Sequence, residues 1–406
     1  MRPAAAERRI PTCLRRRGMM ATVILDGGVA GFTDPAFARV RDAFLANFDA
    51  SAPYREIGAA LSVYAAGRCV VDLWGGVADP TTGRPWTPDT LVHVFSTTKG
   101  LMTVALARLV DEGRLSYDDT VARHWPEFAA GGKAEITVAQ VLSHQSGLNG
   151  FEEPTTVEDF ADWTKITQRL ANQKPFWPPG TQTSYHAMTF GFLAGEIARR
   201  ITGLMPREFV ARMLAAPLKL DASIGAAEAD WGRIALLTPP PPPPGGPPQR
   251  DPIAMKAIGN PMITPAVTTT PLWRRAQVPA ANGHVTARAM ACLWGAVANG
   301  GELEDVRILS RQTIAKMQTP LSTRPDLFMG PGSWGAGVLI NRGGLFGPGA
   351  KAFGNCGFGG SYGYADPELG VGVGYTPNRM FGSALQDPRG MALAAAVAEC
   401  AGRVGS

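Results

Sequence analysis

The chain has 406 residues, which predicts one large domain or two to three domains of modest size, with enough chain for a substantial core. Its residues are 45% hydrophobic and 18% charged, and this composition excludes a disordered, collagen-like or coiled-coil protein. The net charge of +5 arises within residues 1–18, which hold six arginines and one glutamate, so the rest of the chain is neutral in sum. A neutral body argues against nucleic acid as a partner, because phosphate binding needs a basic face on the folded domain.

The arginine-rich start is typical of a transit peptide or of the charged part of a secretory signal. The apolar stretch that follows runs only from Met19 to Leu25, which is too short for a signal core, and no run of about 18 apolar residues follows. We therefore expect no membrane-spanning helix. We expect a cytoplasmic protein whose translation starts at Met19 or Met20, with residues 1–18 as a disordered or absent tag.

The cysteines and histidines show no metal-ligating pattern. The five cysteines are scattered and form no C-x-x-C pair, which favours a reducing compartment over a disulfide framework or a zinc site. The five histidines lack H-E-x-x-H or a similar spacing. We expect neither a metal nor another cofactor.

The predicted elements begin with a helix and a hairpin, pass through a helical middle, and end with strands and a helix. The first helix is capped by Thr33-Asp34-Pro35 and carries an apolar stripe of Phe37, Val40, Phe44 and Phe48. The later predicted elements are a hairpin of residues 59–65 and 69–74, helices over 97–112, 137–144, 187–202, 208–215 and 286–299, strands over 334–341, 351–354, 360–365 and 370–375, and a helix over 389–401.

Residues 239–248 consist only of proline and glycine and predict a stiff polyproline or irregular crossing. The order of elements predicts an α+β fold, with one sheet built from both ends of the chain and a helical lobe inserted into it. We place the α/β lobe at residues 20–115 and 275–406, and the mostly helical lobe, with the Pro-rich loop, at residues 116–274. A cleft between two lobes is the expected place for a small-molecule site.

Two serine-hydrolase patterns compete in this sequence. Residues 359–363 (GGSYG) match the G-x-S-x-G nucleophile elbow, which requires a strand-to-helix turn and a histidine later in the chain. Ser361 is instead followed by a predicted strand, and the last histidine of the chain is His284. We therefore reject Ser361 as a nucleophile.

The second pattern is the S-x-x-K of Ser96 and Lys99. Ser96 ends an apolar run and opens a helix that is apolar on almost every side, so this helix is expected in the centre of the protein. Backbone N–H groups at a helix N-terminus face whatever the serine attacks, and Lys99 lies one turn further on the same face. Burial lowers the pKa of such a lysine and lets it act as a neutral base. The pair alone leaves open that Ser96 only caps the helix while Lys99 reaches solvent.

Tyr185 is the candidate for a third group that carries the proton onward. It lies just before the predicted helix over 187–202. A tyrosine in a loop is more often a packing residue, and spacing alone does not select this one among seven tyrosines.

Four motifs, taken in order, resemble those of the serine β-lactamase and penicillin-binding-protein-like superfamily, and most of all its class C-like esterase branch, the family VIII carboxylesterases. The motifs are residues 94–100 (VFSTTKG), 142–148 (LSHQSGL), 185–187 (YHA) and 354–360 (GNCGFGG). The resemblance extends from about Ala21 to Ala401. It implies a β-lactamase-like fold of helices flanking an antiparallel sheet plus an all-helical lobe. It also implies a nucleophile at Ser96, its base partner at Lys99, and the tyrosine of the Y-x-N motif at Tyr185.

The resemblance also implies the substrate-binding residues Asn355, Gly357 and Phe358. The family's K-T-G or H-x-G triplet corresponds to Asn355-Cys356-Gly357, and the N–H groups of Ser96 and Phe358 would form the oxyanion hole. The chain departs from the family at two positions, because the Y-x-N asparagine is Ala187 and the triplet's cation is Asn355. The missing cation removes an anchor for a substrate carboxylate and favours neutral esters over penicillins or peptidoglycan.

Three nearby residues of reactive type are expected to be structural, namely His144, His186 and Cys356. We expect a serine hydrolase that cleaves small carboxylic esters through an acyl-enzyme on Ser96, with a small-molecule ester as its partner and no nucleic acid or membrane. One alternative is a β-lactamase, D-aminopeptidase or transesterase on the same scaffold. The other is a catalytically weak binding or assembly protein of this fold.

Overall fold

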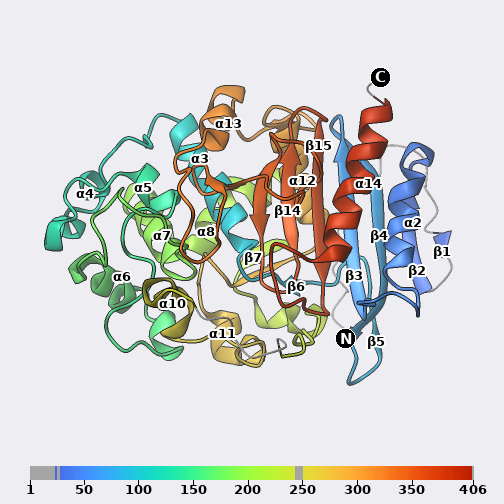
Figure 1. Ribbon diagram of the computed structural model, residues 1–406, viewed down its shortest axis with the longest axis horizontal. Helices are drawn as coiled ribbons and strands as arrows, with labels where there is room; N and C mark the ends of the chain where they lie inside the picture. The colour runs from blue at the N-terminus through green and yellow to red at the C-terminus, as the bar shows by residue number, and fades with distance from the viewer. Residues whose placement is uncertain (1–22, 25–27, 243–249, 405–406) are drawn as a thin grey trace, which may run out of the picture.

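A computed structural model describes residues 23–24, 28–242 and 250–404 of the chain (Figure 1). The predicted N-terminal tag, the choice of start codon and most of the Pro-rich crossing lie outside these residues. Within them, ten strands form one sheet in the order β1-β2-β4-β3-β15-β14-β13-β12-β11, with β5 paired to β4. The strands of this sheet are β1 (Val23–Ile24), β2 (Val29–Thr33), β3 (Gly58–Ala65), β4 (Arg68–Asp79), β5 (Arg84–Pro85), β11 (Ser333–Trp334), β12 (Leu339–Ile340), β13 (Phe353–Cys356), β14 (Tyr362–Asp366) and β15 (Val371–Pro377).

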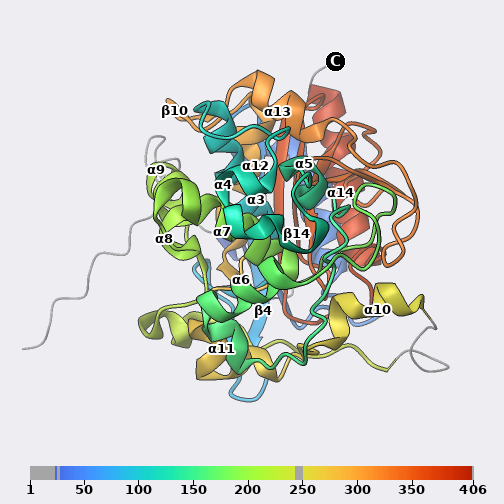
Figure 2. The same cartoon turned by 90° about the vertical axis from the view of Figure 1, so that its left-hand side faces the viewer.

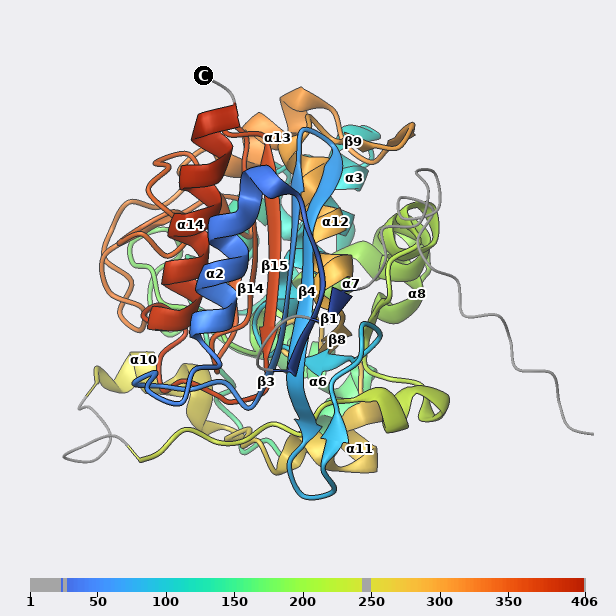
Figure 3. The same ribbon diagram turned by 90° about the vertical axis from the view of Figure 1, so that its right-hand side faces the viewer.

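The sheet joins the two ends of the chain, as the order of predicted elements indicated. Strand β15 pairs antiparallel with β3, with Tyr375 opposite Leu61. Figure 3 shows α2 (Ala38–Ala46) and α14 (Pro388–Val404) side by side on one face of the sheet, and α12 (Ala287–Ala298) on the other. The predicted α+β fold is confirmed.

The central helix of the remaining group is α3, which is buried along most of its length and packs against α7, α8 and α13. Figure 2 faces this helical side of the molecule. The helices are α3 (Thr98–Asp111), α4 (Val121–His124), α5 (Val138–Leu142), α6 (Trp163–Asn172), α7 (Thr189–Thr202), α8 (Pro206–Val210), α9 (Ala216–Leu218), α10 (Pro252–Gly259), α11 (Pro271–Arg275) and α13 (Arg311–Gln318). A small sheet of β6 (Val92–His93), β8 (Gly283–Val285) and β7 (Ala222–Ile224) lies beside them, and β9 (Glu302–Leu303) pairs with β10 (Val306–Arg307). The lobe boundaries stay a prediction.

Local chemistry explains why the first elements form where the sequence predicts them. The Asp34 carboxylate accepts a hydrogen bond from the Ala36 N–H and caps the entry into α2, whose apolar stripe is buried. The β3–β4 hairpin turns through Ala66 and Gly67, both with positive φ, a conformation that matches the twist of the paired strands. Within the described residues, no helix is long and apolar enough to cross a membrane.

The strand predicted over residues 334–341 is wrong in one respect, because the structure divides it into the antiparallel pair β11 and β12. The chain reverses through Gly335 and Gly337, and Gly337 has a φ of +79°. A Cβ at Gly337 would lie 2.4 Å from the Thr103 hydroxyl oxygen, so only glycine lets this turn pack against α3. The pattern of alternating apolar residues continued through the turn and concealed it.

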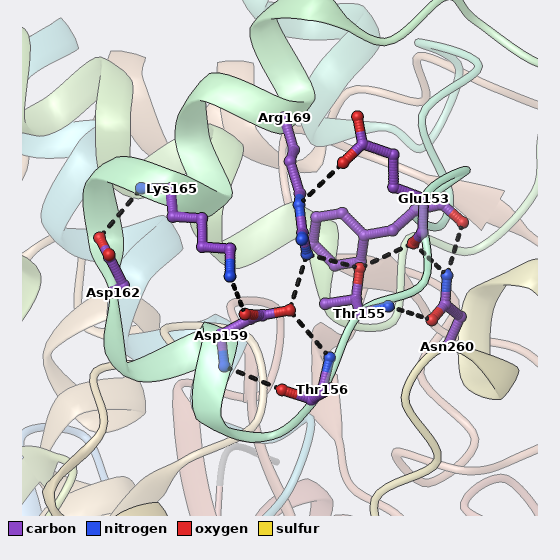
Figure 4. Close-up of polar contacts among 9 residues, drawn as sticks. Glu153, Thr155, Thr156, Asp159, Asp162, Lys165, Arg169 and Asn260 are labelled. Atoms are coloured by element: carbon purple, nitrogen blue, oxygen red, sulfur yellow. Dashed lines mark hydrogen bonds and ion pairs between the residues drawn. The ribbon is translucent and has the colours of Figure 1, made fainter.

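A polar network fixes the start of α6 to the loop before it (Figure 4). The Asp159 carboxylate accepts hydrogen bonds from the Lys165 ammonium at 2.5 Å, the Arg169 guanidinium at 2.8 Å and the Thr156 N–H at 3.1 Å. Asn260, which ends α10, donates to two carbonyl groups of the same loop. The network therefore joins α6 and α10 through one loop.

Asp159→Asn is expected to lower Tm by about 2–5 °C at pH 7, since it removes the negative charge that Lys165 and Arg169 face. These contacts lower the pKa of Asp159 below its ordinary 3.8, with the Lys165 hydrogen bond as the largest cause. Its stabilisation is therefore present above pH 3.8 and is lost as pH falls through the folded-state pKa, so the Tm deficit should shrink at pH 3. Asp162→Asn, which keeps an N-cap oxygen for the Lys165 N–H, is the matched control and should leave Tm within about 1 °C. Equal deficits at both pH values would contradict the prediction.

Candidate active site

Ser96 lies in a tight turn between the small sheet and α3. The preceding Phe95 has a φ of +44°, a strained conformation for a residue with a side chain. The Thr97 N–H donates to the Val94 carbonyl at 3.1 Å and closes this turn. Ser96 is partly exposed between two buried neighbours, so its hydroxyl faces the surface at the helix N-terminus.

Lys99 lies one turn further along α3 and is only 1% exposed. Its Nζ is 3.2 Å from the Ser96 Oγ, 2.8 Å from the Ala187 carbonyl oxygen and 3.0 Å from the Ala280 carbonyl oxygen. Burial lowers the pKa of Lys99 well below its ordinary 10.5. A neutral amine has two N–H donors and one lone pair. With the donors directed to the two carbonyls, the lone pair is left for the Ser96 hydroxyl.

Tyr185 faces the same pair from the start of the segment that leads into α7. Its hydroxyl faces the Ser96 side chain, and its ring centroid is 4.7 Å from the Lys99 Nζ. Burial raises the pKa of the Tyr185 phenol, so the phenol keeps its proton at neutral pH. The structure therefore brings Ser96, Lys99 and Tyr185 together, with one group able to accept a proton and another able to donate one.

Gly357 and Phe358 lie against the turn that carries Ser96. A Cβ on Gly357 would lie 2.1 Å from the Val94 carbonyl oxygen, so only glycine allows β13 to end this close to the turn of Ser96. In the described part of the chain, the N–H groups of Ser96 and Phe358 have no protein acceptor. Both are thus available to a substrate oxygen, as an oxyanion hole requires.

Ser361, the serine of the rejected elbow motif, holds this loop in place. It is 4% exposed, and its hydroxyl donates to the Val94 carbonyl at 3.1 Å. The Thr97 hydroxyl donates to the Ser361 carbonyl at 3.0 Å. Ser361 leads into a strand, β14, and clamps the loop after β13 to the turn of Ser96.

Asn355 is placed apart from these groups. Its amide donates to the Gly337 carbonyl at 3.1 Å, and its Oδ1 faces Gly100 of α3 in the protein interior. The next residue of β13, Cys356, points to the opposite face because side chains alternate along a strand, and it lies near Lys99 and Tyr185. The side chain beside the catalytic groups is therefore a thiol. Burial raises the pKa of Cys356 to about 12, so this thiol is neutral.

The two histidines near the site are buried and neutral. Burial lowers the pKa of His186 to about 3 and that of His144 well below 6.5. The His186 Nδ1 donates to the Ser184 carbonyl at 2.7 Å, and its Nε2 accepts from the Ser146 hydroxyl at 2.7 Å. The His186 N–H in turn donates to the His144 Nδ1 at 3.1 Å. These contacts hold the Tyr185 segment against the loop after α5.

Sequence reasoning missed several groups around the site. The carbonyls of Ala187 and Ala280 act through the backbone, which leaves no residue-type signal. Asp326 and Trp334, which contact Tyr185, lie in or next to an irregular loop without a recognisable motif. The sequence around Asp326 and Trp334 contains other polar and aromatic residues, but such a composition is too common to predict a site.

Comparisons with known proteins identify the family of the chain. The profile of the Beta-lactamase family matches residues 42–396. The esterase/beta-lactamase LipL of Mycobacterium tuberculosis is 36% identical over 366 residues, which cover 87% of this chain and 83% of that protein. The crystal structure of a family VIII carboxylesterase has a TM-score of 0.87 at 40% identity and covers 92% of this chain and 99% of its own. For a penicillin-binding protein homologue from Caulobacter crescentus, the TM-score is 0.84 at 39% identity, with the same coverage.

Fold and site together define an enzyme of the serine β-lactamase and esterase superfamily. The chain belongs to the Beta-lactamase family, and the match covers nearly the whole described region. The resemblance found in the four motifs is thereby confirmed.

Proposed function

We propose that the protein is a serine carboxylesterase that hydrolyses small carboxylic esters through an acyl-enzyme intermediate on Ser96. The observation that carries this proposal is the buried Lys99 amine, which lies 3.2 Å from the Ser96 hydroxyl while two backbone carbonyls accept its N–H groups. If Ser96 only capped the helix, the Lys99 side chain would be expected to reach solvent, but it is 1% exposed. The geometry thus favours the catalytic interpretation over a binding or assembly role.

The reaction follows from the positions of the groups. The Ser96 oxygen forms a bond to the acyl carbon as its proton passes to the Lys99 amine, and the N–H groups of Ser96 and Phe358 stabilise the oxyanion. The bond to the alcohol then breaks, and the neutral Tyr185 phenol donates a proton to the leaving alkoxide, with Lys99 returning a proton to Tyr185. A water molecule attacks the acyl-enzyme, releases the acid and restores the Ser96 hydroxyl.

The substrate class follows from the charges beside the nucleophile. The neutral Cys356 thiol lies beside Lys99 and Tyr185, and Asn355 faces the interior, so the triplet supplies no cation for a carboxylate. An ester needs only the nucleophile and the oxyanion donors at its acyl carbon. The names of the family VIII carboxylesterase and of LipL support ester hydrolysis.

β-Lactam hydrolysis is the second candidate, favoured by the combined name of the relative LipL. The same acylation step would open a β-lactam ring, but the missing cation predicts a low rate for substrates that carry a carboxylate. The proposal includes a cytoplasmic location and a small-molecule ester as the partner, with neither nucleic acid nor cofactor.

A fluorophosphonate probe combined with peptide mass mapping tests the proposal. We expect one probe equivalent on Ser96, loss of p-nitrophenyl acetate hydrolysis in proportion to labelling, and a kcat/KM for nitrocefin at least about 100-fold below that for the ester, which corresponds to about 3 kcal/mol of transition-state stabilisation. Ester hydrolysis that survives full labelling of Ser96 would overturn the assignment. Comparable rates on both substrates would favour the second candidate.

A further inference from the structure

Asp326 is a buried carboxylate next to Tyr185, and it is 4% exposed. Its Oδ1 accepts hydrogen bonds from the Tyr185 N–H at 3.1 Å, the Phe328 N–H at 2.8 Å and the Met329 N–H at 2.9 Å. Its Oδ2 accepts from the Trp334 indole N–H at 3.1 Å. One carboxylate thus connects the Tyr185 backbone to a loop and to the end of β11.

The groups held by Asp326 also hold the Tyr185 ring. The Trp334 ring stacks on the Tyr185 ring at 5.6 Å with an interplanar angle of 14°, and the Phe328 ring stacks at 6.0 Å with an angle of 27°. Two flat contacts restrict rotation of the phenol and fix the direction of its hydroxyl. That hydroxyl is the one that faces Ser96.

We infer that Asp326 is the positioning residue of the Tyr185 phenol. Its carboxylate fixes the main chain of Tyr185 and both stacking rings as one unit, and so sets the hydroxyl at the distance from Ser96 that proton transfer needs. Asp326 touches neither the nucleophile nor the leaving group, so it acts only through Tyr185. The inference rests on the proposed function, because it assumes that Tyr185 carries a proton in ester hydrolysis.

Asp326→Asn is the first test, because an amide keeps the shape but replaces one acceptor oxygen by a donor. We expect kcat for p-nitrophenyl acetate to fall about 10–100-fold with KM changed less than about twofold, since misplacement of a catalytic group by about 1 Å can cost about 100-fold. Fluorophosphonate labelling of Ser96 should persist.

Asp366→Asn is the matched control. Asp366 is 1% exposed and accepts from the N–H groups of Glu368 and Leu369, two and three residues later, as Asp326 does from Phe328 and Met329. It is the last residue of β14 and lacks the links to a tyrosine backbone and an indole. We expect kcat within about twofold of wild type. Equal losses of kcat in the two variants would overturn the inference.

A double-mutant cycle with Tyr185→Phe shows whether Asp326 acts through Tyr185. We expect Asp326→Asn to reduce kcat in the wild-type background and to change it by less than about twofold in the Tyr185→Phe background. The same fold-loss in both backgrounds would refute the positioning role. If Tyr185→Phe itself leaves kcat unchanged, the proton-transfer role of Tyr185 fails instead, which separates the two proposals.

Trp334→Phe tests the positioning role of Asp326 if the Asp326→Asn variant does not fold. This variant removes the indole N–H and makes the ring system smaller, but it keeps an aromatic ring to stack on Tyr185. We expect kcat to fall about 3–10-fold, again with no further loss in the Tyr185→Phe background. A loss that is independent of Tyr185 would contradict the inference.

Discussion

Ser96→Ala is expected to lower kcat/KM for a short-chain aryl ester by at least about 10⁴-fold, because no covalent intermediate can form and the oxyanion donors act alone. The fold should be retained, since Ser96 is partly exposed and its side chain lies at the helix surface. Initial rates measured together with circular dichroism and thermal unfolding check both parts of this expectation. Activity within about tenfold of wild type would exclude Ser96 as the nucleophile.

Ser361→Ala is the control that the chain itself offers. Both serines lie in motifs of hydrolase type, but Ser361 donates to the Val94 carbonyl and holds a loop, whereas Ser96 faces Lys99. We expect Ser361→Ala to lower Tm by about 2–4 °C for the lost buried hydrogen bonds while most of the activity remains. A stable but inactive Ser361→Ala variant would instead support Ser361 as the nucleophile of the elbow motif.

Lys99→Met is expected to reduce kcat about 10³-fold, since it removes the amine that accepts the Ser96 proton and keeps much of the buried side-chain volume. Lys99→Arg should be equally inactive, because a guanidinium keeps its charge and has no lone pair to offer. Recovery of activity in the Arg variant would show that Lys99 supplies only charge. Single-turnover acylation rates separate this step from hydrolysis of the acyl-enzyme.

The pKa of Lys99 also makes stability depend on pH, which activity assays cannot report. The folded-state pKa lies below the ordinary 10.5, so between the two values the unfolded chain binds one proton more than the folded chain, and stability rises with pH. The unfolding free energy of the wild type minus that of Lys99→Met should therefore increase with pH between the folded-state pKa of Lys99 and about pH 10.5. Urea denaturation at pH 7, 8 and 9 measures this slope. Parallel curves would mean that Lys99 stays protonated in the folded protein.

Much of the fold could be predicted because its elements carry local signals. The cap at Asp34, the turn at Ala66 and Gly67, and the capping box at Thr137 lie where the sequence indicates them. The strand predicted over residues 334–341 was wrong because apolar alternation continues through the turn at Gly335 and Gly337. The lobe boundaries depend on packing over long sequence distances, for which the chain has no local mark.

Some site residues could likewise be predicted from local sequence, and others could not. Ser96 and Lys99 are one helical turn apart, so their proximity is fixed locally, whereas the resemblance to a family supplied Tyr185. The position of Asn355 could not be derived, because a shift of one residue along a strand exchanges the two faces of the sheet. The structure shows that Cys356 lies near Lys99, whereas Asn355 contacts the Gly337 carbonyl.

The pairing of β15 with β3 has a consequence for the order in which the enzyme becomes active during its synthesis. Ser96 and Lys99 leave the ribosome early, but Gly357 and Phe358, which complete the site, and β15, which joins the centre of the sheet, are made only near the end. The chain between Ser96 and Phe358 must therefore be made and folded before the proposed nucleophile meets the second proposed oxyanion donor. We therefore expect acylating activity only in chains whose synthesis and folding are almost complete.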